Sequence, residues 1–116
     1  MAKIARKQEL PPAPKRFRDF SRKHPKVARA YEDLGEAVRG AGPLTEREVA
    51  LVKLALSIGA RSEGGAHAHT RKGLGAGVEP DALRHVAILA VPTLGFPHMM
   101  AALGWVEETV EAYLKR

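Results

Sequence analysis

Three residues near the middle of the chain have the side-chain types and the spacing that acid/base chemistry needs. Glu63, His67 and His69 lie within seven residues of one another. Glu63 and His67 are four residues apart and share one face of a helix, whereas His69 is turned by about 200° from His67. Histidine moves protons near neutral pH, and a carboxylate can orient its ring. The pattern predicts a catalytic set of His69, Glu63 and His67, in which one histidine is the general acid or base.

Two other interpretations of these residues stay open. Histidine is commonly part-buried without a catalytic duty, so the pair could be one structural and one solvated side chain. Glu63 and His67 also have a chelating spacing, but a metal site needs three or four ligands. A third ligand would have to come from His69, His85, His98 or another subunit, and no motif of the H-E-x-x-H kind is present. We therefore predict no metal and no cofactor, and whether this segment binds a metal is left open.

Groups that suit an anionic ligand flank the same segment. Gly64 and Gly65 could bring backbone N–H groups close to a carboxylate at a helix start, and Arg71 and Lys72 add positive charge one to two turns later. His98 follows a proline at another helix start. The sequence predicts that these five residues bind a small carboxylate substrate. The alternative for the two glycines is that they only permit close approach of two helices.

The positive charge of the chain is concentrated near its start. The net charge is +6, but residues 1–30 contain ten basic and two acidic residues, whereas the remainder is slightly acidic. Four prolines interrupt this stretch, so we expect residues 1–24 to form a basic arm that is extended or only briefly helical. Phe17 and Phe20 are its only large apolar anchors, and no nucleic-acid-binding motif is present. We expect a solvated or subunit-wrapping arm rather than nucleic-acid binding.

Every later segment has helical periodicity, and no strand pattern appears. The apolar stripe of Val27, Tyr31, Leu34 and Val38 precedes a Gly-Pro stop, and Thr45 with Glu48 forms a capping box. The next helix is apolar on most sides and should be central or at an oligomer contact. Pro92 should bend or stop the fourth helix. We expect an all-α domain of five to six helices over 25–116, with later helices at 46–58, 63–74, from 80 and from 97.

Composition excludes several classes of protein. There are no cysteines, which excludes disulfides, thiolate metal sites and thiol redox chemistry. No apolar run reaches the roughly 18 residues that a membrane span needs, and no signal-type apolar core follows the basic start. We expect a cytoplasmic protein without membrane contact.

The residues from Leu44 to about Val106 resemble the carboxymuconolactone decarboxylase family, which includes the alkyl hydroperoxidase D-like proteins. The resemblance rests on three elements in combination: A-H-T-R at 68–71, A-G-V at 76–78 and G-F-P at 95–97. It implies a compact all-α fold that associates as homotrimers or homohexamers, with active sites near subunit contacts.

The family has peroxidase-type and decarboxylase-type members, and the residues at the motif positions indicate which type this chain resembles. Peroxidase-type members use a C-x-x-C pair with a relay glutamate, and these positions are Ser62, Gly65 and Ala50 in this chain. Serine and glycine cannot undergo thiol oxidation, so we do not expect peroxidase activity. Decarboxylase-type members keep a glutamate and a histidine that fall on Glu63 and His69. The resemblance implies lyase-type acid/base chemistry on a small carboxylate metabolite, with His69 central, and the alternative is a non-catalytic oligomeric binding or scaffold protein.

Overall fold

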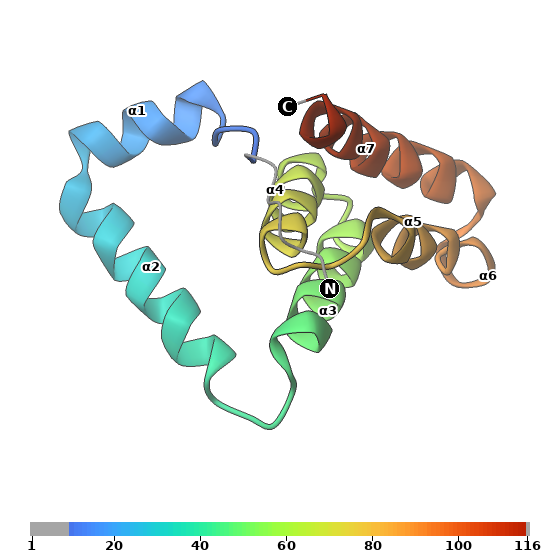
Figure 1. Ribbon diagram of the computed structural model, residues 1–116, viewed down its shortest axis with the longest axis horizontal. Helices are drawn as coiled ribbons and strands as arrows, with labels where there is room; N and C mark the ends of the chain where they lie inside the picture. The colour runs from blue at the N-terminus through green and yellow to red at the C-terminus, as the bar shows by residue number, and fades with distance from the viewer. Residues whose placement is uncertain (1–9, 116) are drawn as a thin grey trace. The chain divides into compact units, whose positions relative to one another are not determined.

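The structure is a computed structural model that describes residues 10–115, so the first nine residues of the predicted arm and Arg116 lie outside it. The described residues form helices and no strands, which confirms the all-α prediction (Figure 1). Six of the helices fall within 25–116. The helices are α1 (Lys15–Lys23), α2 (Pro25–Arg39), α3 (Glu46–Gly59), α4 (Glu63–Gly75), α5 (Pro80–Ile88), α6 (Val91–Leu94) and α7 (Phe96–Leu114).

The chain divides into two compact units. Pro12–Thr45 forms one unit with α1 and α2, and the residues from Glu46 onward form the other together with Leu10 and Pro11. The boundary between these units therefore follows α2, whereas the predicted arm ends at residue 24. In the first unit only Ala28 is buried in a helix. The apolar stripe of α2 stays exposed; it consists of Val27, Tyr31, Leu34 and Val38.

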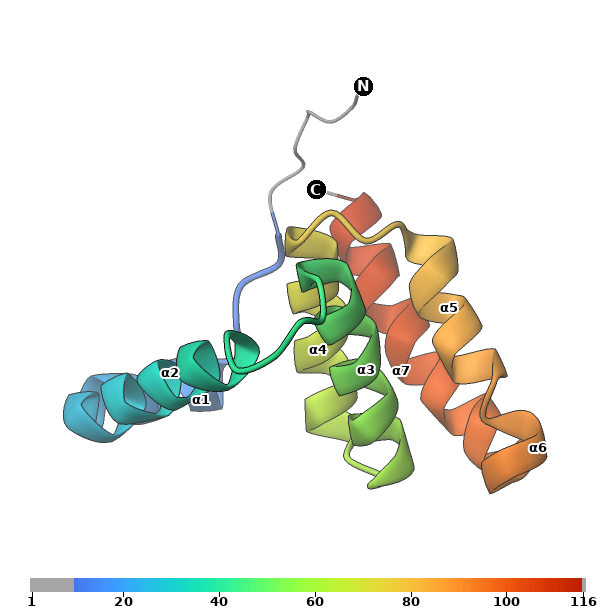
Figure 2. The ribbon, with the colours of Figure 1, turned by 90° about the horizontal axis from the view of Figure 1, so that it is seen from below.

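The second unit is a bundle of four longer helices. α3 packs on α4 and α5, and α7 packs on α4 and α5. Figure 2 shows that α3 and α5 run in one direction along the bundle, while α4 and α7 run in the other. The core contains side chains from all four helices, among them Leu54, Leu74, Leu83 and Val106. α3 lies against two helices but is not central, because only Leu54 and Ile58 of its side chains are buried, and Val52 and Leu56 are exposed.

Proline and glycine set the helix boundaries between α5 and α7. Pro80 is in the first turn of α5, where its missing N–H costs nothing. The predicted fourth helix ends earlier than Pro92, because α5 stops at Ile88 and Pro92 instead lies in the first turn of the short α6. Gly95 then has φ of 102°, a conformation that favours glycine, and α7 begins at Phe96.

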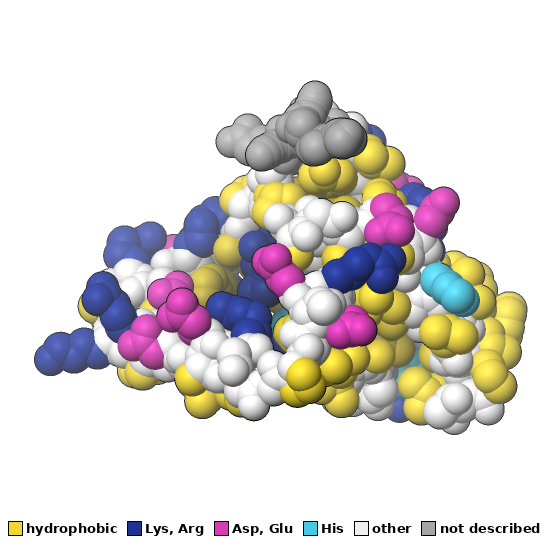
Figure 3. Space-filling model, turned by 60° about the horizontal axis from the view of Figure 1, so that its bottom comes forward, with side chains coloured by type: hydrophobic (Ala, Val, Ile, Leu, Met, Phe, Trp, Pro, Cys, Tyr) yellow, Lys and Arg dark blue, Asp and Glu magenta, His cyan; other side chains and the backbone are white. Residues whose placement is uncertain are grey.

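Side chains of different kinds gather on different parts of the surface. Figure 3 shows hydrophobic side chains clustered at the end of the bundle where α6 lies, and many Lys and Arg side chains over α1 and α2. Among the described residues, no helix has both the length and the apolar character that crossing a membrane requires.

Candidate functional site

The start of α4 places the predicted site residues. Ser62 is the N-cap, and its hydroxyl oxygen accepts a hydrogen bond from the Gly65 backbone N–H at 3.0 Å. Ser62 occupies the position of the first cysteine in the peroxidase-type motif, and here its hydroxyl caps a helix. The Gly65 N–H is therefore already used within the protein, and the expectation that it binds an anion has no support from this geometry.

Gly65 is needed for close packing of α4 against α3. A Cβ atom at this position would lie 2.7 Å from Ser57 Oγ and 2.8 Å from Ser62 Oγ. A Cβ at the neighbouring Gly64 would have nothing within 4 Å. Gly65 therefore permits the close approach of two helices, whereas Gly64 faces open space.

These two glycines form a matched pair for a stability measurement. Gly65→Ala is expected to lower the free energy of unfolding by about 1–3 kcal/mol, because the new methyl group overpacks the α3–α4 contact. Gly64→Ala is expected to raise it by up to about 1 kcal/mol, because alanine has the higher helix propensity and meets no neighbour. Urea unfolding followed by circular dichroism measures both. Equal effects of the two substitutions would contradict the packing role of Gly65.

His67 and Glu63 come together on one face of α4, as their spacing predicts. His67 Nε2 lies 3.5 Å from Glu63 Oε2 and 3.3 Å from Glu108 Oε1, which comes from α7. His67 Nδ1 lies 2.8 Å from the hydroxyl oxygen of Thr109, which is buried. Both glutamates are largely exposed, with side-chain exposures of 61% and 68%. This cluster of Glu63, His67, Glu108 and Thr109, here called the α4–α7 cluster, lies at the surface between two helices.

His69 lies in a different electrostatic setting. It is partly buried, and burial together with the positive charges of Lys72, Lys53 and Arg71 lowers the pKa of its imidazole from 6.5 to about 4. Its ring is therefore neutral at pH 7, and the cationic side chains that act on it come from α3 and α4. The α4–α7 cluster involves His67 and not His69, which agrees with their predicted separation around the helix. The predicted catalytic set of His69, Glu63 and His67 is thus divided between two surroundings.

The sign of this pKa shift determines its effect on stability. The pKa of His69 is lower in the folded chain than the value of 6.5 for an unperturbed histidine, so protonation favours the unfolded chain. Above about pH 6.5 His69 is neutral in both the folded and the unfolded chain, and its effect does not change with pH. Between pH 6.5 and 4 the free energy of unfolding falls as the pH drops, because the unfolded chain takes up the proton first.

The remaining predicted residues lie in three kinds of environment. Arg71 is partly buried and Lys72 is exposed, and the positive charges of both lower the pKa of His69. His98 is 7% exposed, and both of its ring nitrogens lack a hydrogen-bond partner among residues 10–115. It lies eleven residues before Thr109 on α7, which places it about 16 Å away along the helix. His98 is therefore outside the α4–α7 cluster.

Two residues in these surroundings were not predicted from the sequence, and the sequence favours a surface position over a pocket position for a third, Lys53. Glu108 and Thr109 complete the setting of His67, and Lys53 contributes positive charge to that of His69. A lysine within the apolar pattern of α3 was the only available signal, and such a lysine more often lies at the surface. Residue spacing in the sequence does not show that α7 packs against α4. Glu108 and Thr109 could therefore be identified only from the tertiary structure.

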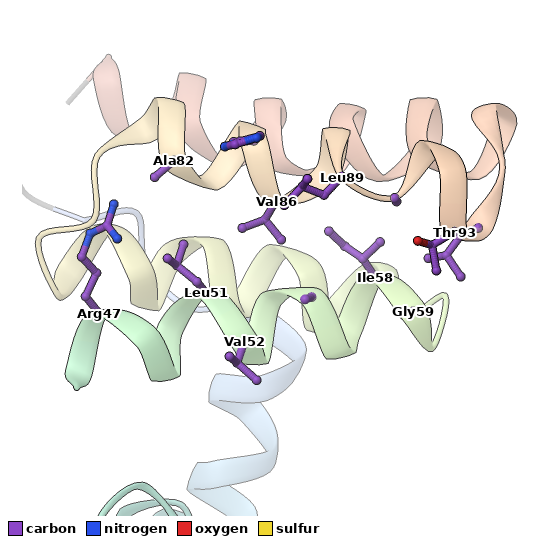
Figure 4. A pocket seen from close by; sticks show the side chains of 13 residues that line it. Arg47, Leu51, Val52, Ile58, Gly59, Ala82, Val86, Leu89 and Thr93 are labelled. Carbon is purple, nitrogen blue, oxygen red and sulfur yellow. The ribbon is translucent and has the colours of Figure 1, made fainter. Parts of the chain in front are cut away.

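An apolar groove runs between α3 and α5–α6. Its volume is about 580 Å³. Figure 4 shows Leu51 and Ile58 of α3 directed toward α5, with Val86 opposite and Arg47 near one end. Three of the side chains that line the groove are exposed although apolar, namely Val52, Leu89 and Leu94. The groove is a hydrophobic surface with few polar groups.

Two arginines form ion pairs that link different segments of the second unit. Arg47 contacts Glu79 at 3.2 Å, which links α3 to the segment before α5. Arg84 contacts Glu107 at 3.0 Å and Asp81 at 2.8 Å, and these carboxylates raise the pKa of its guanidinium. Arg84 therefore links α5 to α7.

Comparison with known proteins gives one match. The family described as "Carboxymuconolactone decarboxylase family" matches residues 25–108, which is more than half of the chain. No curated protein and no solved structure matches this chain. The match extends through α2 to the first two thirds of α7 and includes all of the side chains around His69.

Proposed function

The chain belongs to the carboxymuconolactone decarboxylase family, and we propose from this premise that it carries out lyase-type acid/base chemistry on a small carboxylate metabolite, with His69 as the proton-transfer group. The observation that carries the proposal is the setting of His69. A partly buried, neutral imidazole lies among the positive charges of Lys53, Arg71 and Lys72. A histidine with a purely structural role does not require positive charges near its ring, whereas a site that binds an acidic substrate does.

The same charges account for substrate attraction and for control of the proton. Cationic groups favour binding of a carboxylate, and partial burial strengthens that attraction. A bound carboxylate offsets the charges that depress the pKa of His69, so the imidazole gains affinity for a proton when the substrate arrives. The empty site thus keeps His69 neutral, and a bound carboxylate favours the protonated, proton-donating form of its ring.

The chemistry follows from these properties. In decarboxylation of a lactone acid, the bond between the carboxylate carbon and the ring breaks and CO₂ leaves. The electron pair of that bond remains on the ring as a dienolate, which takes up one proton. Protonated His69 supplies this proton and is then reprotonated from solvent. The direct test is release of CO₂ from unsaturated lactone acids by wild-type protein and by the His69→Gln variant.

A second candidate function is assembly, which the apolar groove favours. Monomeric proteins rarely leave large contiguous apolar patches exposed. The groove between α3 and α5–α6 and the exposed stripe of α2 are both of this kind. We propose that a second copy of the chain covers the groove, within a homotrimer or homohexamer of the kind that the family resemblance implies. Assembly and catalysis are compatible, and the scaffold alternative is the case in which only assembly remains.

A further inference from the structure

Three potential metal ligands converge where α4 contacts α7. His67 Nε2, a carboxylate oxygen of Glu63 and a carboxylate oxygen of Glu108 all lie within 4.8 Å of one another. The Nε2 atom is 3.5 Å from Glu63 Oε2 and 3.3 Å from Glu108 Oε1. In a tetrahedral zinc site with bonds of about 2.0–2.2 Å, neighbouring ligand atoms are about 3.3–3.6 Å apart. Both distances from His67 therefore match the edges of a zinc tetrahedron.

The histidine ring is oriented by a side chain behind it. The hydroxyl oxygen of the buried Thr109 lies 2.8 Å from His67 Nδ1. If Nδ1–H donates to this oxygen, the lone pair of Nε2 faces the two carboxylates. Metal-bound histidines generally have such an outer partner, which fixes the tautomer and the ring direction. Three electron-pair donors then lie close together, an arrangement that a bound cation stabilises.

We propose that Glu63, His67 and Glu108 bind one divalent transition-metal ion of the zinc type. An imidazole ligand favours this class over Mg²⁺ and Ca²⁺, which prefer oxygen ligands alone. Two carboxylates and a neutral imidazole balance the charge of a divalent ion. Three protein ligands leave one tetrahedral position for water or an anionic ligand, and the exposure of both glutamates keeps that position open to solvent.

The proposed ion has a structural consequence that is separate from the chemistry at His69. It would join the first turns of α4 to the second half of α7, two helices that also meet through core packing. A ligand that binds only the folded chain raises its stability. Metal binding should therefore raise the melting temperature even in a variant without His69.

The test is titration of the metal-free, untagged full-length protein with zinc chloride by calorimetry. We expect one zinc ion per chain for the wild type. His67→Ala and Glu108→Gln should weaken binding about 100-fold or more, because they remove ligands. Thr109→Val keeps the shape of the side chain but removes the hydroxyl, and it should weaken binding about 10- to 100-fold. His85→Ala and Glu36→Gln change an exposed histidine and glutamate elsewhere and should bind zinc as the wild type does.

A second measurement keeps the proposal independent of folding defects. Cobalt added to the wild type should give the intense visible bands of tetrahedral coordination, and zinc should raise its melting temperature. Both signals should be lost in Glu108→Gln protein whose circular dichroism spectrum is unchanged. Binding of less than one ion per chain, or equal affinity of the His67→Ala and His85→Ala proteins, would overturn the proposal. The α4–α7 cluster would then be an ion pair between a protonated histidine and two carboxylates.

Discussion

Replacement of His69 by glutamine is expected to reduce kcat/KM for decarboxylation of a small lactone acid by about 10²- to 10⁴-fold, the range that a positioned proton-transfer group contributes. Glutamine keeps a polar side chain of similar reach but cannot donate and regain a proton. The cations Lys53, Arg71 and Lys72 remain, so substrate should still bind and the loss should appear mainly in kcat. The rate of CO₂ release gives kcat at saturating substrate and kcat/KM at low substrate.

The matched control is His24→Gln, which changes an exposed histidine of the other unit that does not line the apolar groove. It should retain wild-type turnover. Circular dichroism and the mass in solution should be unchanged in both variants, because neither side chain belongs to the buried core. Normal turnover by the His69→Gln protein would end the acid/base proposal. Absence of turnover and of carboxylate binding in the wild type would favour the scaffold alternative.

Arginine in place of Leu89 is expected to convert the assembled protein into single chains. Leu89 lines the groove and is 60% exposed, so the substitution leaves the core of the bundle intact. In an assembly whose groove is covered by a second copy, it would bury an unpaired charge, which costs several kcal/mol. Light scattering after size exclusion should give the mass of three or six chains for the wild type and of one chain for the variant.

Leu114→Arg provides the control for this measurement. Leu114 is 53% exposed at the end of α7 and does not line the groove, so its replacement should leave the mass of the assembly unchanged. A wild-type mass of one chain would contradict the assembly proposal. An unchanged mass for the Leu89→Arg protein would show that the groove is not the contact surface.

Most of the fold could be predicted because its signals are local. Helix periodicity, the stop at Gly40 and the prolines at helix starts depend only on neighbours in the sequence. The predicted ranges for α3 and α4 differ from the observed helices by one residue at their ends. Pro92 was harder to place, because a proline can end one helix or open the next, and only the packing of α5 and α6 decides between them.

The candidate site was predicted only as far as one helix determines it. The 200° separation of His67 and His69 follows from helix geometry, and the structure gives the two rings different neighbours. The pairing of Glu63 with His67 was predicted from their spacing. Glu108, the third charged residue of the α4–α7 cluster, was not, because it lies on α7, which the sequence alone cannot place beside α4. The sequence alone favours a surface position for Lys53 over a pocket cation, because its charge acts on His69 only across the packing of α3 against α4.

The most direct test of the central claim is an NMR titration of the His69 ring in the wild-type protein, with EDTA present to keep the protein free of metal. The resonance is assigned by its absence from the His69→Gln spectrum. We expect a midpoint at about pH 4 in the free protein and a higher midpoint when a small dicarboxylate is bound. Lys53→Met should also raise the midpoint, because it removes one of the charges that depress the pKa. A midpoint at or above 6.5, unchanged by dicarboxylate, would contradict a cationic substrate site around His69.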